Sequence, residues 1–194
     1  MTTSFQISGI STFEGREWIT GRVLSGTVTA GSSLLAVGTA EIPVTLEEVV
    51  VEGTSRPAAA GEEASLYLAA GATVLLPRGT EVYFALVEPG ALRRASGIRA
   101  EFEWATLSDG PSSGLPGADP AMPPIREDAR VELRFCDIDI SATLLKPDRN
   151  TPGGGRTTEE LRFDEPLPVI PGYPFFVEIG GAYAAMGKVL GATE

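Results

Sequence analysis

Two aspartates separated by one residue come closest to a reactive pair in this sequence. Asp137 and Asp139 lie in a segment with strand-like alternation, so their side chains are expected on one face of a strand. Such a carboxylate pair can bind a divalent cation or share a proton. Two solvated carboxylates beside a bend are the favoured interpretation, because no third acidic residue that would complete a metal site is recognisable nearby.

A single thiol is the second candidate for chemistry. Cys136 is the only cysteine, which excludes an intramolecular disulfide and a thiolate metal cage. A nucleophilic role is disfavoured because no histidine is available to activate the thiol and the adjacent Asp137 opposes thiolate formation. We therefore interpret Cys136 as a half-buried structural residue in a protein from a reducing compartment.

The composition removes several classes of function. The absence of histidine excludes histidine-based catalytic triads, histidine general bases and imidazole zinc sites. The chain has 15 basic and 26 acidic side chains, a net charge of −11, which is the opposite of a phosphate-tracking surface. No P-loop motif is present, since Gly153 to Gly155 lead into Arg156 without a lysine. We expect no enzyme activity, no catalytic residue, no cofactor and no metal.

Membrane and secretion signals are not recognisable. No stretch approaches 18 consecutive apolar residues, and the first residues have neither the basic nor the apolar region of a signal peptide. We therefore expect a cytoplasmic protein that does not contact a membrane.

The elements that must position these residues are expected to be β-strands. Short segments with alternating apolar residues recur between 23 glycines and 15 prolines, most clearly in 98–104, 131–135 and 175–179. The alternation changes phase after residue 135, which predicts a bulge or bend near residues 136 and 137. Many short strands without long alternating helices predict an all-β fold of barrels or sandwiches.

One segment is ambiguous between helix and strand. Residues 57–71 are rich in alanine, but Gly61 interrupts a helix there and Gly71 ends it. The sequence therefore predicts a loop followed by a strand. Two stretches dense in glycine, proline and serine or threonine, 108–124 and 147–158, are expected to be long loops.

A turn-rich segment divides the chain into two halves. Residues 88–94 contain a Pro-Gly turn followed by two arginines, which predicts domains at 1–95 and 96–194. The first half has 6 basic and 10 acidic residues, and the second has 9 and 16. Neither half has the basic balance of a nucleic-acid-binding domain.

Each half of the chain carries a series of short motifs, most of which contain glycine. The first half carries Gly15-Arg16, Thr20-Gly21-Arg22-Val23, Gly26, Gly31, Gly61-Glu62-Glu63, Arg78-Gly79 and Pro89-Gly90. The second half carries Asp139-Ile140-Ser141-Ala142-Thr143-Leu144, Gly180-Gly181 and Gly187-Lys188-Val189. These motifs resemble domains two and three of translational GTPases of the elongation factor Tu type, over nearly the whole chain. The resemblance implies two antiparallel β-barrels, the first like domain two and the second like domain three, without the GTPase domain.

The resemblance also implies a set of binding positions. In that family, domains two and three help the GTPase domain to hold aminoacyl-tRNA, and the corresponding positions here are Ser8, Gly9, Ser11, Glu63, Ala69, Cys136 and Ala182. Glu63 places a carboxylate where the family has a neutral amide, and polar or cationic side chains are lost at several other positions. This pattern disfavours ordinary aminoacyl-tRNA delivery, because fewer groups remain to contact the RNA.

Two arginines and most of four aromatic residues are expected to have structural roles. Arg22 and Arg78 lie beside turn glycines, where a guanidinium can tie loops together. The aromatic residues Trp18, Trp104, Phe175 and Phe176 are expected mostly in the core, with an aromatic anchor for a protein partner as the alternative.

The favoured hypothesis is an accessory protein like elongation factor Tu domains two and three. It would be a non-enzymatic binding module for a protein partner, either a GTPase domain or another translation component. One alternative is a translation-related protein that binds RNA, in particular aminoacyl-tRNA, although the acidic charge disfavours RNA. The other is the accessory part of a split translational GTPase.

Overall fold

The chain folds into β-strands throughout its described parts. The computed structural model describes residues 2–13, 16–38, 40–69, 83–104, 128–135, 138–145 and 155–193, and no helix occurs among them. The prediction of an all-β fold is therefore confirmed. Nothing in these parts offers a helix with the length and hydropathy that a bilayer crossing requires.

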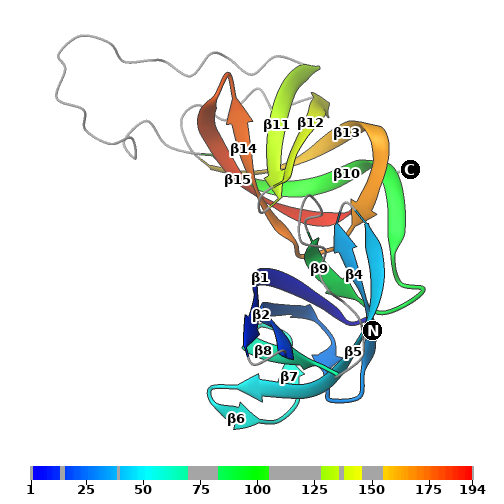
Figure 1. Ribbon diagram of the computed structural model, residues 1–194. Helices are drawn as coiled ribbons and strands as arrows, with labels where there is room; N and C mark the ends of the chain where they lie inside the picture. Colours follow the sequence, from blue (N-terminus) through cyan, green and yellow to red (C-terminus); the bar gives the residue numbers. More distant parts are fainter. Residues whose placement is uncertain are drawn as a thin grey trace, which may run out of the picture. The chain divides into compact units, whose positions relative to one another are not determined.

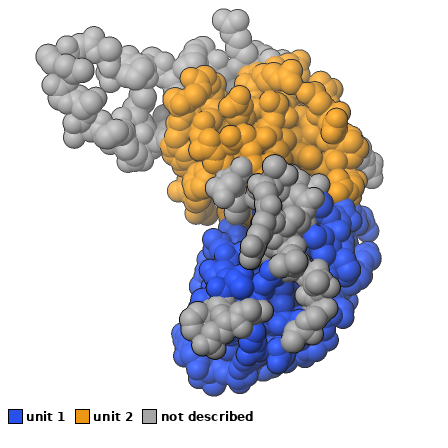
Figure 2. All heavy atoms as spheres, viewed as in Figure 1, with its two compact units in different colours: residues 1–93 blue, residues 94–194 orange. Residues whose placement is uncertain are grey.

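The chain forms two compact units, Met1–Arg93 and Arg94–Glu194 (Figure 2). The boundary expected from the sequence, between residues 95 and 96, falls within the first residues of strand β10 (Arg93–Trp104).

Unit 1 is a closed antiparallel barrel (Figure 1). Its sheet has the order β4-β9-β1-β2-β8-β5-β6, and a further pairing of β4 with β5 closes the barrel. Two short strands pair with each other beside it. The strands are β1 (Ser4–Phe13), β2 (Arg16–Ser25), β3 (Thr27–Val28), β4 (Ser33–Gly38), β5 (Glu41–Val51), β6 (Thr54–Ser55), β7 (Ala58–Ala59), β8 (Glu63–Leu68) and β9 (Tyr83–Val87).

Unit 2 is a second closed barrel, with the strand order β10-β13-β12-β11-β14-β15. Both predicted antiparallel barrels are therefore present. Besides β10, its strands are β11 (Ala129–Phe135), β12 (Ile138–Leu145), β13 (Gly155–Val169), β14 (Pro174–Ile179) and β15 (Ala182–Ala192).

Alternating burial explains why these segments form barrel walls. In β10 the side chains of Ile98, Ala100, Phe102 and Trp104 are buried, and in β11 those of Val131, Leu133 and Phe135 are buried. The intervening side chains, mostly charged, are exposed or half-buried. Each strand thus contributes one apolar face to the interior of its barrel, as the period of two predicts.

The phase change after residue 135 falls between two strands, and the bulge or bend predicted near residues 136 and 137 lies outside the described residues. Phe135 ends β11 and lies opposite Ile138, the first residue of β12, so the segment is two paired antiparallel strands rather than one irregular strand. Residues 136 and 137, including Cys136, lie outside the described residues. In 57–71 the predicted strand is present as β8, which follows a turn, and the predicted loop before it contains the two-residue strand β7. Residues 70 and 71 lie outside the described residues.

Two motif glycines allow strands to pack unusually close to their neighbours. A Cβ added to Gly21 on β2 would overlap the carbonyl oxygen of Gln6 on β1 and lie 2.8 Å from Cε1 of Phe5. A Cβ added to Gly187 on β15 would overlap the ring of Phe175 on β14. Neither glycine has a positive φ, unlike the turn glycines of the same motifs, so close packing accounts for both residues.

Candidate functional site

The positions predicted in unit 1 gather on two strands that flank β2. On β1, Gly9 lies opposite Thr20 and Ser11 opposite Trp18, and Ser8 falls at a register shift between paired residues. All three β1 positions are exposed or half-buried. They therefore form one accessible stretch on the wall of the first barrel.

Glu63 lies on the other side of β2, at some distance from this stretch. It begins β8 opposite Arg22, four residues along β2 from the partner of Ser11. At the rise of a β-strand, four residues span about 13 Å, so Ser11 and Glu63 do not share one small site. Ala69 follows β8 and donates its backbone N–H to the carbonyl oxygen of Thr45 at 2.9 Å.

Arg22 has the structural role expected from the sequence. Its Nε donates a hydrogen bond to the carbonyl oxygen of Gly61 at 3.0 Å and lies 3.8 Å from Oε1 of Glu63. Both side chains are exposed, so the ion pair itself contributes little to stability. The guanidinium nevertheless ties β2 to the turn before β8. Arg78 lies outside the described residues.

A second arginine clamps the same turn. Arg56 donates to both carboxylate oxygens of Glu62, at 2.8 and 3.1 Å, and the N–H of Ala59 donates to Glu62 at 2.7 Å. The hydrogen bond from Arg56, followed by that from Ala59, lowers the pKa of Glu62 to about 2. Glu62 is therefore ionised at neutral pH and is unsuited to proton transfer there.

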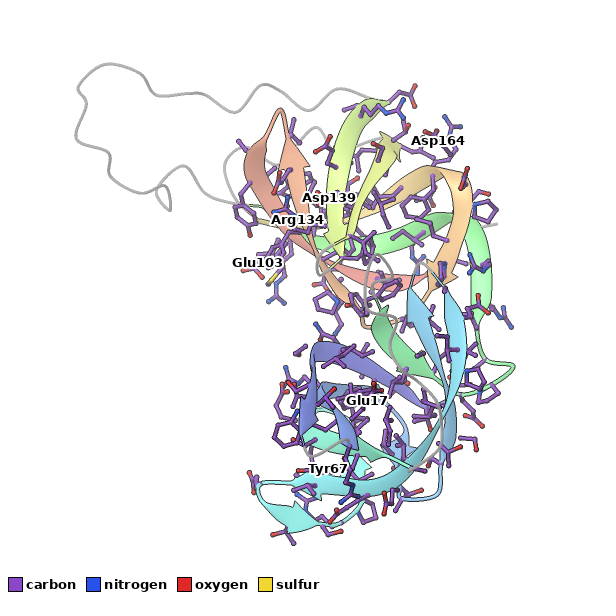
Figure 3. All side chains as sticks on the ribbon, viewed as in Figure 1. Glu17, Tyr67, Glu103, Arg134, Asp139 and Asp164 are labelled. Atoms are coloured by element: carbon purple, nitrogen blue, oxygen red, sulfur yellow. The ribbon has the colours of Figure 1, made fainter. Side chains whose placement is uncertain are left out.

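An aromatic and cationic cluster covers β2 and β8 near Ser11. The ring of Tyr67, labelled in Figure 3, lies 5.5 Å from that of Trp18, and the guanidinium carbon of Arg16 lies 5.5 Å from the centre of the Tyr67 ring. Arg16 also pairs with Glu47 at 2.8 Å. Nothing in the sequence pattern indicated Tyr67, because its contacts depend on the cross-strand register.

In unit 2, the predicted aspartate pair is only partly described. Nε of Arg134 donates to Oδ1 of Asp139 at 2.8 Å, and this hydrogen bond lowers the pKa of Asp139 (Figure 3). Asp137 lies outside the described residues. Asp139 is therefore held by an arginine, and within the described ranges no group of three potential ligand side chains could hold a metal ion.

Three of the four exposed large apolar side chains on β14 and β15, the fourth being Leu190, lie close together on the outer face of these strands. Phe176, Tyr183 and Met186 are 49%, 53% and 43% exposed, and we call them the β14–β15 patch. Phe176 lies opposite Met186, and its ring is 6.1 Å from that of Tyr183. Ala182, a predicted binding position, directly precedes Tyr183 and is exposed.

Charged side chains surround this patch. Arg134 lies opposite Phe176 on β11, and its Nη1 is 3.2 Å from Oε1 of Glu178. Glu103 lies opposite Met186 on β10 and pairs with Arg156 at 3.6 Å. The apolar centre with a charged rim has the composition of a protein-binding surface.

The aromatic residues considered in the sequence divide between core and surface. Trp104 and Phe175 are buried, as predicted, and the indole N–H of Trp104 donates to Oγ1 of Thr157 at 2.8 Å. Phe176 is exposed, as the alternative of an aromatic anchor requires, because it points to the opposite side of β14 from Phe175. Tyr183 and Met186 were missed, since nothing in the sequence distinguishes the outer from the inner face of β15.

No family model matches the sequence. No curated protein matches it either. The resemblance to elongation factor Tu domains therefore stays a prediction carried by the motifs quoted above.

Proposed function

We propose that the protein is a non-enzymatic binding module that docks on a protein partner through the β14–β15 patch. The observation that carries this proposal is the exposure of Phe176, Tyr183 and Met186 on the outside of a closed barrel. The interior of that barrel has its own apolar core, so these three side chains are not needed to fill it. Clustered exposed aromatic and methionine side chains are typical of protein interfaces.

The charge of the chain supports a protein partner over RNA. The net charge of −11 repels a phosphate backbone, and carboxylates lie beside the patch at Glu103 and Glu178. The motif resemblance suggests the class of partner, which is a GTPase domain or another translation component.

The test is affinity capture of the tagged full chain from a lysate of its host at low salt, with nuclease treatment. The double variant Tyr183→Ser/Met186→Ser removes the centre of the patch. The control Ile10→Ser changes an exposed apolar side chain on unit 1. We expect one protein to be retained by the wild type and by the control, and lost by the double variant.

Two results would contradict the proposal. Retention of no protein by the wild type would exclude a stable docking partner. Enrichment of tRNA that disappears as the salt concentration rises would instead favour the RNA-binding alternative.

A further inference from the structure

Two carboxylates face each other beside the β14–β15 patch. Glu132 on β11 lies opposite Glu178 on β14, and Glu178 lies opposite Tyr183 on β15. Side chains opposite each other on neighbouring strands have Cβ atoms about 5 Å apart, and like charges at that distance repel. The outer face therefore holds two adjacent negative charges next to an exposed aromatic ring.

The nearby arginines neutralise these charges only in part. Arg134 lies between Asp139 and Glu178, at 2.8 and 3.2 Å, so one cation serves two carboxylates. Arg130, two residues from Glu132 on the same strand, pairs with Asp164 at 2.7 Å. Within the described ranges no ion pair reaches Glu132. The carboxylates of Glu132, Glu178 and Asp139 together with the guanidinium of Arg134 therefore carry two excess negative charges.

Resting on the proposed function, we infer that the patch binds a protein segment in which an arginine or lysine lies next to a large apolar side chain. The cation would lie between Glu132 and Glu178 and against the ring of Tyr183, where carboxylates and an aromatic face both attract it. The apolar side chain would pack on Phe176 and Met186. The acidic chain as a whole would speed the approach of such a basic segment.

The first experiment selects ligands without assuming their sequence. A phage-displayed library of random decapeptides is panned on the purified full chain, and bound phage are eluted with excess soluble protein. The same library is panned on Tyr183→Ser. We expect peptides that combine arginine or lysine with a large apolar residue to be enriched on the wild type and not on Tyr183→Ser.

The second experiment measures the charge contribution with the most enriched synthetic peptide. Binding is followed by fluorescence anisotropy at 50 and 200 mM salt. The double variant Glu132→Gln/Glu178→Gln should raise the Kd about fivefold at 50 mM salt, as expected for two exposed ion pairs, and should reduce its salt dependence. The matched control Glu160→Gln changes an exposed glutamate on β13, which is separated from β14 by two strands in either direction around the barrel, and should leave the Kd unchanged.

The outcomes separate this inference from the proposed function. Peptides rich in apolar residues but not in cations, with a Kd unaffected by the glutamine variant, would overturn the inference and leave the protein-binding function intact. If the wild type and Tyr183→Ser enriched the same peptides, the patch would be excluded as the binding site in both proposals. A concentration-dependent dimer in sedimentation experiments, abolished by Tyr183→Ser, would also overturn the inference, because the patch would then bind a second copy of the chain.

Discussion

Replacing Gly187 by alanine would test how closely β15 packs on the core of unit 2. Gly187 lies opposite Phe175, and a Cβ at this position would be 2.9 Å from Cε1 of Phe175 and closer still to two other ring atoms. Gly187 has no positive φ, so alanine can adopt its backbone conformation. The expected cost is therefore steric.

The surroundings of Phe175 set the size of this cost. The ring is 1% exposed and is packed at 5.1 Å against Phe135 and at 5.7 Å against Phe102. It cannot move away without disturbing these contacts. Forcing an extra methyl group into a packed core costs about 1–3 kcal/mol, and the lower conformational entropy of alanine in the unfolded chain offsets about 0.5–1 kcal/mol. We expect the free energy of unfolding to fall by about 1–2 kcal/mol.

The assay is urea unfolding followed by tryptophan fluorescence. Gly191→Ala is the matched control, because Gly191 lies on the same strand and an added Cβ there would meet no atom within 4 Å. The control should be at least as stable as the wild type. The double variant Gly187→Ala/Phe175→Leu should lose less stability than the sum of its single variants, because the smaller side chain leaves space for the methyl group. Equal stability of Gly187→Ala and Gly191→Ala would refute the close packing.

Three further predictions concern single contacts. Gly21→Ala should lower the free energy of unfolding by about 3 kcal/mol in urea titrations, because its Cβ would meet a backbone carbonyl of β1 that cannot rotate away; wild-type stability would contradict this. Glu62→Gln removes the partner of Arg56, and the pKa of Glu62 is lowered from 4.5 to about 2 in the folded chain. The stabilisation of the folded chain by the ion pair of Glu62 with Arg56 should therefore be complete above pH 4.5 and disappear as the pH falls towards 2. The difference in Tm between wild type and variant should shrink over that range. A difference independent of pH would exclude the ion pair as its cause. Thr157→Val should cost about 1 kcal/mol in thermal unfolding, because the partly buried indole N–H of Trp104 loses its acceptor; an unchanged Tm would show that water replaces the hydroxyl group.

The candidate surfaces were only partly predictable from the sequence. The motif resemblance placed Ser8, Gly9 and Ser11 together, and the structure has them on one accessible strand because they are close in sequence. The resemblance also predicted Ala182 as a binding position. This residue directly precedes Tyr183 of the β14–β15 patch, but the resemblance did not indicate the patch itself. The cluster around Tyr67 and the opposed carboxylates Glu132 and Glu178 depend on pairing between strands that are far apart in the chain.

The all-β class and the inward faces of several strands follow from local patterns in the sequence. A period of two is a local property, since successive side chains of an extended chain point to opposite sides, and an apolar set on one side must be buried. The neighbours of each outward-facing residue, in contrast, depend on how the strands pair. Phe175 and Phe176 are adjacent in sequence, yet one packs in the core and the other is exposed beside Met186. Alternation alone puts the two rings on opposite faces of β14. The residues that lie beside each ring depend on the register of β14 against β11 and β15, which closure of the barrel sets.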